Sequence, residues 1–223
     1  MSPIRPSLKP RGRGQSLVEF TISLPVLLMM LSGLIEFGFL LNDYLDLIDA
    51  AREAARFAAN DDPTLSDPPH PSESPNFWNR AWRVARDSLI TASDGRIDWK
   101  SDPFNCDAVE GDIVVSAFSV KGTTVVAQFP PTYADVGAAN CAIWGGNPLI
   151  WGTPLNPKYP SKLTKADVNA LLSGASIPNS GFVVVEIYYE YDVISWFSAF
   201  LPDPIVLYAY TIMPNTYAEP PTP

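Results

Sequence analysis

One apolar run constrains this chain more than any other feature. It extends from Phe20 to Leu41, and Glu36 is the only formally charged residue within it. About 20 helical residues rise about 30 Å, which matches the hydrocarbon core of a bilayer. The run is longer than the apolar region of a secretory signal peptide, and no small-residue cleavage site follows it closely. We therefore expect a retained transmembrane helix with membrane lipid around it.

The charges on either side of this helix predict its orientation. Residues 1–14 contain four basic side chains and no acidic one, whereas all 24 acidic residues of the chain follow them. Segments rich in Lys and Arg stay on the cytoplasmic side of a membrane helix. The N-terminus is therefore expected inside and the C-terminal part outside, in a single-pass topology. The acidity of the outer part argues against nucleic acid as a partner.

Several residues of the helix are candidates for contacts between subunits. Pro25 removes a backbone hydrogen bond, which neighbouring helices or the nearby Thr21 hydroxyl can offset. Gly33 and Gly38 allow another helix to approach closely. Glu19 either reaches the headgroups or pairs with a positive charge on a neighbouring subunit, such as a new α-amino group.

Glu36 is expected near the outer interface, where reaching the headgroups is the preferred interpretation. Beyond it, the helix is predicted to continue to about Ala59, because small and apolar residues recur at spacings of three and four. This stripe comprises Leu41, Leu45, Ile48, Ala51, Ala55 and Ala58. Such a stripe packs against another surface. That surface is either the outer domain of the same chain or another subunit, and the pattern does not choose between them.

Four segments together resemble a known family. They are Gly14 to Phe20 (GQSLVEF), Leu24-Pro25, Ile35 to Gly38 (IEFG) and Asp49 to Ala59 (DAAREAARFAA). This combination is similar to the TadE-like pseudopilins of the bacterial tight-adherence (Flp, type IVb) pilus machinery. The resemblance covers about 45 residues at the N-terminus.

The resemblance implies a maturation step and a way of assembling. A prepilin peptidase would cut after Gly14, which makes residues 1–14 a leader peptide and Gln15 the new N-terminus. Glu19 would become mature residue five, the family position that meets the amino terminus of a neighbour. Subunit assembly is assigned to Glu19, Pro25, Gly33, Glu36 and Gly38. The implied partners are other pilin and pseudopilin subunits and the inner-membrane assembly platform, and the implied location is the bacterial cytoplasmic membrane or an assembled pilus.

The remaining pattern predicts an α+β fold. We expect a transmembrane and stalk helix over 15–60, a Pro-rich linker over 61–76 and an extracytoplasmic domain over 77–223. A short helix is predicted to start near Pro75 and to end at Gly95. Its apolar face comprises Phe77 or Trp78, Ala81, Trp82, Ala85 and Leu89. We interpret this face as core packing rather than a binding surface.

Residues after 110 change to the period of strands. Residues 112–120 and 123–129 flank Lys121-Gly122 and predict a hairpin. Residues 181–193 and 204–213 predict two more strands, which would complete an antiparallel sheet. On the first of these two strands, one face is expected to carry Val183, Val185, Ile187, Tyr189 and Tyr191. Thr164 and Asp167 resemble a capping box before a short helix.

Cys106 and Cys141 both lie outside the membrane in this topology. In an oxidising compartment they are expected to form one disulfide, and two free thiols are the alternative. Closing a loop of about 36 residues would stabilise the fold by roughly 4 kcal/mol in the chain-entropy model. Two cysteines and one histidine are too few for the usual four ligands of a structural zinc site. We expect no metal and no cofactor.

Enzymatic chemistry has little support in the sequence. His70, the single histidine, lies among prolines, and no phosphate-binding glycine loop, HExxH motif or nucleophile elbow is present. The acidic residues of the linker do not have the spacing of an EF-hand loop. The alternative to a pseudopilin is a single-pass surface protein whose aromatic-rich domain binds a glycan or another surface ligand. Exposed Trp144 and Trp151 would favour that alternative.

Overall fold

The fold was determined as a computed structural model. It describes residues 15–63, 75–97, 111–129, 159, 161–173, 180–194 and 201–218. Gly14, most of the linker, His70, both cysteines, Trp144 and Trp151 lie outside these residues. The cleavage site and the disulfide therefore stay predictions.

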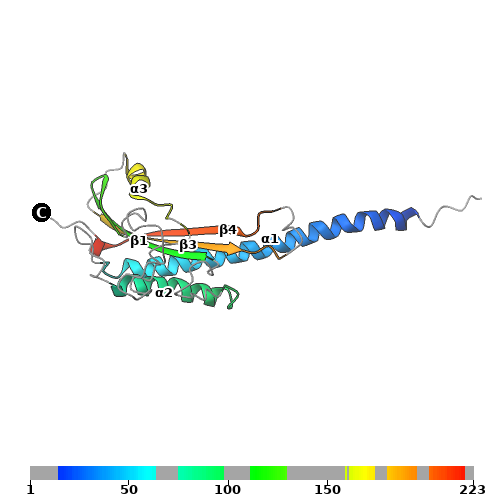
Figure 1. The fold of residues 1–223 in the computed structure, drawn as a ribbon, viewed down its shortest axis with the longest axis horizontal. Helices are drawn as coiled ribbons and strands as arrows, with labels where there is room; N and C mark the ends of the chain where they lie inside the picture. Colours follow the sequence, from blue (N-terminus) through cyan, green and yellow to red (C-terminus); the bar gives the residue numbers. More distant parts are fainter. Residues whose placement is uncertain are drawn as a thin grey trace, which may run out of the picture.

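Helix α1 (Gln15–Ala59) is the longest element of the protein and is continuous through Pro25. Its N-terminal part projects away from the rest of the molecule, and its C-terminal part lies along the outer domain (Figure 1). Within the described residues, this is the one helix that is long and apolar enough to cross a membrane. The predicted long apolar helix followed by an α+β domain is thus confirmed.

Helix α2 (Pro75–Ala92) packs antiparallel to the second half of α1. An ion pair between Arg80 and Asp61 lies at one end of the helix pair, and an ion pair between Arg96 and Asp43 lies at the other. The chain leaves α2 at Gly95, whose positive φ of 75° lets its N–H donate to the carbonyl of Ile90 at 2.9 Å. The predicted helix end and apolar face are confirmed, apart from the side chain of Trp78, which is not described.

A four-stranded antiparallel sheet completes the domain. It contains β1 (Gly111–Lys121), β2 (Thr124–Phe129), β3 (Ser180–Tyr191) and β4 (Ile205–Pro214) in the order β2-β1-β3-β4. The hairpin between β1 and β2 turns at Gly122, which has a φ of 64°. A short helix, α3 (Lys165–Leu172), and a 3-10 turn, η5 (Thr216–Ala218), lie outside the sheet.

The main core lies between one face of the sheet and the two long helices. The odd-numbered residues of β3 predicted to share a face do point into this core. They pack on residues of the helices and of the neighbouring strands: Leu47, Ala50, Ala51, Ala54, Ala55, Ala58, Phe77, Ala81, Trp82, Ala85, Leu89, Ile113, Val115, Leu207 and Ala209. A smaller core on the opposite face joins α3 to β1, β2 and β3. A sheet covered by helices on one face and partly by α3 on the other is an α+β layer arrangement.

The apolar stripe of α1 docks on the chain's own domain, but its position differs from the prediction. Ala51, Ala55 and Ala58 are buried as expected, whereas Leu41 and Leu45 are exposed. Leu47 and Ala50 take their place, because α1 is covered by α2 on one side and by the sheet on the other. The many alanines allow this close double contact, since small side chains bring helix axes together.

The capping box of α3 is present as predicted. The Thr164 hydroxyl accepts a hydrogen bond from the backbone N–H of Asp167, and the Asp167 carboxylate accepts one from the Thr164 N–H at 3.0 Å. The hydrogen bonds from the Thr164 side chain and backbone lower the pKa of Asp167. The cap fixes the start of α3 against the edge strand β2, where Asn169 Oδ1 accepts the N–H of Val125 at 2.7 Å.

Candidate functional site

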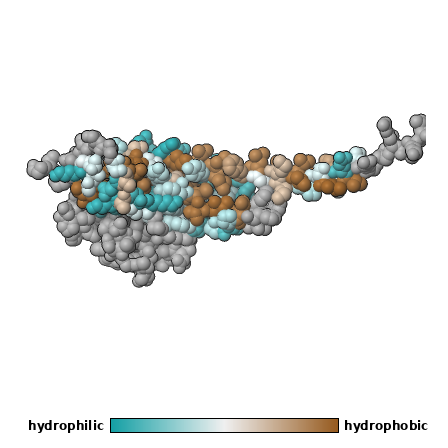
Figure 2. Space-filling view, turned by 90° about the horizontal axis from the view of Figure 1, so that it is seen from above, coloured by the Kyte–Doolittle hydropathy of each residue, from teal (hydrophilic) through white to brown (hydrophobic). Residues whose placement is uncertain are grey.

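The projecting part of α1 exposes an almost unbroken apolar surface. Its exposed large side chains are Leu17, Val18, Phe20, Ile22, Leu24, Val26, Leu27, Leu28, Met29, Met30, Leu31, Leu34 and Ile35. In water this surface would be strongly unfavourable. Figure 2 shows the hydrophobic colour running along the projecting helix and onto the nearest end of the domain. The surface is suited to contact with lipid or with other apolar helices.

Glu19 is the acidic residue on this apolar surface. Its side chain is exposed in the single protein chain, and its carboxylate has no hydrogen bond or ion pair within the residues that the structure describes. The backbone carbonyl of Glu19 accepts a hydrogen bond from the Ser23 hydroxyl at 2.7 Å. This contact within the helix leaves the Glu19 carboxylate unused. A carboxylate in an apolar setting is stabilised by a positively charged partner. Glu19 is therefore available to a partner outside the chain.

Pro25 lies on the projecting part of the helix, Gly33 is half-buried, and Gly38 follows the domain-bound Glu36 by two residues. The Thr21 hydroxyl donates to the carbonyl of Leu17 at 2.8 Å, one turn earlier, and so does not offset the hydrogen bond that Pro25 removes. That expectation is wrong, because an exposed threonine in a helix reaches back to the carbonyl four residues before it. Gly38 is exposed, with no atom within 4 Å of the position that a Cβ would occupy. Its surface is open to another helix.

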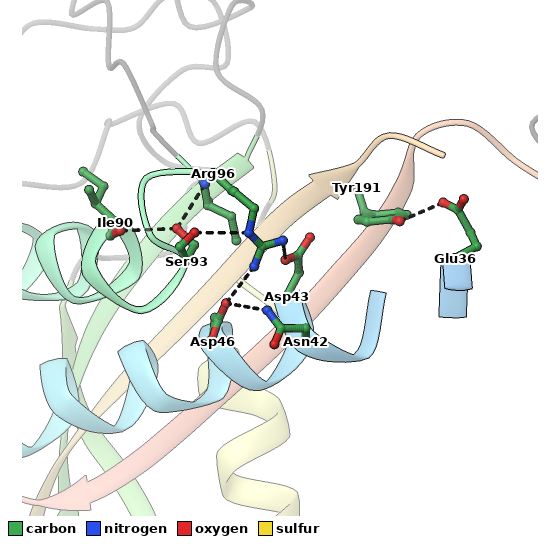
Figure 3. A network of polar contacts seen from close by, with 9 residues as sticks. Glu36, Asn42, Asp43, Asp46, Ile90, Ser93, Arg96 and Tyr191 are labelled. Carbon is green, nitrogen blue, oxygen red and sulfur yellow. Dashed lines mark hydrogen bonds and ion pairs between the residues drawn. The ribbon is translucent and has the colours of Figure 1, made fainter. Parts of the chain in front are cut away.

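Glu36 has a different environment from the other candidate residues. It is buried, and its Oε1 accepts the Tyr191 hydroxyl at 2.7 Å (Figure 3). The same oxygen accepts the backbone N–H of Ile194 at 3.0 Å. Burial and the hydrogen bond to Glu36 raise the pKa of Tyr191, so its hydroxyl stays protonated and donates. The preferred interpretation, in which Glu36 reaches the headgroups, does not match these contacts. Glu36 instead ties α1 to the end of β3.

A second polar contact lies about two turns further along α1. Arg96 Nη1 donates to Asp43 Oδ1 at 2.7 Å, and Arg96 Nη2 lies 3.4 Å from Asp46 Oδ2 (Figure 3). The Asp43 side chain is only 6% exposed, and this guanidinium is the cation that offsets the burial of its carboxylate. The Arg96 Nε also donates to the carbonyl of Ser93, which holds the guanidinium in place. This contact fixes the end of α2 on α1.

The far end of α1 is fixed by Asn215. Its Nδ2 donates to the carbonyl of Ala58, in the last turn of α1, and to that of Asp61, just beyond the helix, at 2.8 Å each. Gly181 makes this approach possible, since a Cβ there would lie 2.4 Å from the Asn215 carbonyl oxygen. Three junctions therefore join α1 to the domain: one at Glu36, one at Asp43 and one at Asn215.

Sequence reasoning missed the partners in these junctions. Arg96, Tyr191 and Asn215 had no motif to single them out, because each acts on a residue distant in sequence. One signal was available for Arg96. Asp43 lies on the same helix face as the buried Leu47, and an acid on a core face requires a cation or several donors.

A buried carboxylate also lies on the opposite face of the sheet. Glu186 is fully buried and accepts hydrogen bonds from the Lys162 N–H at 2.9 Å, the Tyr208 hydroxyl at 2.8 Å and the Ser161 hydroxyl. Burial, followed by the charge of Glu186, raises the pKa of Tyr208. Because donors surround this carboxylate, its role is to fix the segment before α3 rather than to act on a ligand. Among the described residues, no three His, Cys, Asp or Glu side chains are grouped to hold a metal.

Among the described residues, α1 has an apolar N-terminal part, an exposed Glu19 near its start and three junctions to one domain. Residues 14–56 match the model of the family described as TadE-like protein. The chain carries a TadE-like segment. The resemblance to that family is thus confirmed over these residues, which contain every predicted assembly residue. No curated protein and no solved structure matches the chain.

The TadE-like segment supports a coarse assignment of function. It supports a relation to the pseudopilins of the Tad pilus, a family of structural proteins. It also indicates a membrane-anchored protein that interacts with other pilus subunits. The match ends at residue 56, so the TadE-like segment stops within α1, and the junction partners Arg96, Tyr191 and Asn215 lie outside it.

Proposed function

We propose that this protein is a minor pseudopilin of a Tad/Flp-type pilus, assembled through its N-terminal helix during pilus biogenesis and adhesion. The observation that carries this proposal is Glu19, an exposed acid without a partner among the described residues, in a segment that matches the TadE-like family. Cleavage after Gly14 by a prepilin peptidase would place a new α-amino group at Gln15. The Glu19 carboxylate of one subunit would pair with the α-amino group of its neighbour in an apolar setting.

The other predicted residues act around this pair. Gly33 and Gly38 allow a neighbouring helix to approach, and Pro25 adjusts the course of the helix at this contact. The role of Glu36 differs from theirs, because its carboxylate is bound to Tyr191 and Ile194 of the same chain. We propose that Glu36 contributes to assembly indirectly, by setting the angle between the helix and the outer domain.

The size of the outer domain supports a minor role. The domain extends over most of the chain beyond residue 60, and its helices and sheet are joined to α1 at three junctions. A subunit with so much mass around the helix is suited to an initiating or terminal position, where neighbours need not pack on every side. The pilus assembly platform of the inner membrane would receive the cleaved subunit.

The first test is the N-terminus and intact mass of the protein purified from its own membrane. A chain that begins at Gln15 supports processing, and N-methylation of that residue would add to the support. A chain that begins at Met1 or Ser2, in cells with an active prepilin peptidase, would contradict the proposal.

Glu19→Ala tests the assembly role separately. We expect this variant to be inserted and processed normally, whereas piliation counted by electron microscopy is lost. Glu53→Ala is the matched control, because Glu53 is an acid of the same helix whose partner, Arg56, is on the same chain at 2.6 Å. Normal piliation in Glu19→Ala would refute the proposed pairing.

A further inference from the structure

One face of α1 carries residues at a regular spacing that continues past the membrane-spanning part. These residues alternate at intervals of four and three along the helix and are Phe20, Leu24, Leu27, Leu31, Leu34, Gly38, Leu41 and Leu45. All of them are exposed in the single chain. Alternating intervals of four and three form the heptad repeat of a coiled coil, in which such residues share one face of the helix. We call this set the leucine seam.

The leucine seam lies on the side of α1 that faces away from the outer domain. The residues that follow its outer positions by two are buried or pack on the chain's own core, and they are Glu36, Leu40, Asp43 and Leu47. Two positions correspond to about 200° around a helix, which is nearly the opposite side. Further along the side of the seam, the Arg52 side chain is 64% exposed. The outer domain therefore leaves room for another helix along this side.

The outer part of the leucine seam lies beyond the hydrocarbon of a bilayer. From Glu19 to Leu45 the helix rises about 39 Å, whereas the hydrocarbon core is about 30 Å thick. Asp46 and Arg96 pair at the level of Leu45, and their side chains are 17% and 46% exposed. Partly exposed charges are costly in hydrocarbon, so this level lies outside it. Lipid tails therefore do not cover Leu41 and Leu45, and their continuity with the rest of the seam indicates a protein contact.

A second copy of this chain matches the leucine seam. The partner must present an apolar face that crosses the bilayer and continues to the level of Leu45. A second copy in the same membrane has its own seam at the same depth and in the same direction, and leucines at heptad positions pack against their equivalents in a parallel pair. Gly38, with no atom within 4 Å of its Cβ position, lets the two helices approach closely. The next position of the repeat, Ile48, packs on the chain's own core, so the seam ends after Leu45 in both copies.

We propose that two copies of this chain pair in the membrane through the leucine seam, with their α1 helices parallel and in register from Phe20 to Leu45. The two outer domains then lie on the outside of the pair. Glu19 lies about a quarter turn from the seam, so its carboxylate stays available to another subunit. The pairing rests on the membrane anchor, and it requires neither cleavage after Gly14 nor the Glu19 contact of the proposed function.

Photo-crosslinking of the full chain in phosphatidylcholine liposomes tests the proposal. A benzophenone amino acid replaces Leu41 or Phe39 in separate samples, and the products are identified by mass spectrometry. Phe39 is the matched control, since the two side chains are 41% and 44% exposed but lie on nearly opposite sides of the helix. We expect a product of twice the chain mass at position 41 and none above background at position 39.

Three results would overturn the proposal. They are lipid adducts alone at position 41, an equal yield of the double-mass product at position 39, and, in the protein's own membrane, crosslinks from position 41 to a different protein only. The Glu19→Ala variant separates this pairing from the assembly contact. It should give the same double-mass product, and loss of the product in this variant would show that the seam does not suffice for pairing.

A second measurement keeps the probe at position 41 and changes one other side chain. Leu45→Asn should lose the double-mass product, whereas Phe39→Asn should keep it, because only Leu45 belongs to the seam. Both side chains are exposed in the single chain, so the Tm of the outer domain should stay the same in both variants. A double-mass product that persists in Leu45→Asn would contradict the pairing.

Discussion

The ion pair between Arg96 and Asp43 makes a quantitative prediction about how α1 is held. Arg96→Met keeps most of the side-chain stem and removes the guanidinium, which leaves a carboxylate that is 6% exposed without its cation. Removing one partner of a fully buried pair costs about 3–5 kcal/mol. Arg96 itself is 46% exposed, so water replaces part of the lost interaction. We therefore expect the free energy of unfolding to fall by about 1–3 kcal/mol.

The expected change is large enough to measure by thermal unfolding. In a chain of this size, 1 kcal/mol corresponds to about 2–4 °C, so a loss of 2 kcal/mol lowers Tm by about 4–8 °C. The assay is near-ultraviolet circular dichroism of the full chain in detergent micelles. Arg52→Met is the matched control, since Arg52 pairs with Asp49 on the same helix and these side chains are 64% and 72% exposed. Its Tm should change little, because exposed ion pairs contribute about 0–1 kcal/mol.

A double-mutant cycle completes the test. Asp43→Asn alone and Arg96→Met alone should each lower Tm, and the double variant should lose less than the sum of the two. Additive losses, or equal losses from Arg96→Met and Arg52→Met, would refute the reasoning that a buried pair joins α2 to α1.

Two further predictions concern other parts of the fold. Gly181→Ala should lower the free energy of unfolding by about 1–3 kcal/mol, since the new Cβ would overlap the Asn215 carbonyl oxygen. Gly38→Ala, in open space, should leave the free energy of unfolding unchanged or raise it. Equal denaturation midpoints for the two variants would contradict this prediction. Asp167→Asn should lower the free energy of unfolding at neutral pH. The difference in this free energy between the variant and the unmodified protein should vanish as the pH falls through the lowered pKa of Asp167. A carboxylate with a lowered pKa stabilises the fold only while it is ionised. A difference that persisted below that pH would show that the cap does not depend on the charge.

The parts of the fold that depend on neighbours in sequence were predictable. The apolar run predicted α1, the change to period two predicted the strands, and Lys121-Gly122 marked the hairpin between them. The capping box at Thr164 and the helix end at Gly95 followed in the same way. In each case the deciding interaction lies within a few residues, so the sequence pattern contains it.

The junctions between α1 and the domain were not predictable, because their partners are far apart in the chain. Glu36 was interpreted as an interfacial acid, and the fold places it against Tyr191 and Ile194. The predicted buried stripe included Leu41 and Leu45, which are exposed. Periodicity shows that one face of a helix is buried, but it does not show how wide the covering surface is. The position of α2 beside α1 decided that width.

The sequence by itself therefore determined the long apolar helix, the TadE-like segment and the order of helices and strands. These follow from hydrophobicity, charge and local hydrogen bonding, all of which act along the chain. The tertiary structure alone decided which acidic residues of α1 remain available to a partner outside the chain. Glu19 is exposed, while Glu36 and Asp43 are bound within the chain. The physical reason is that a carboxylate on an apolar helix needs a donor or a cation, and only the folded domain shows where one is already provided.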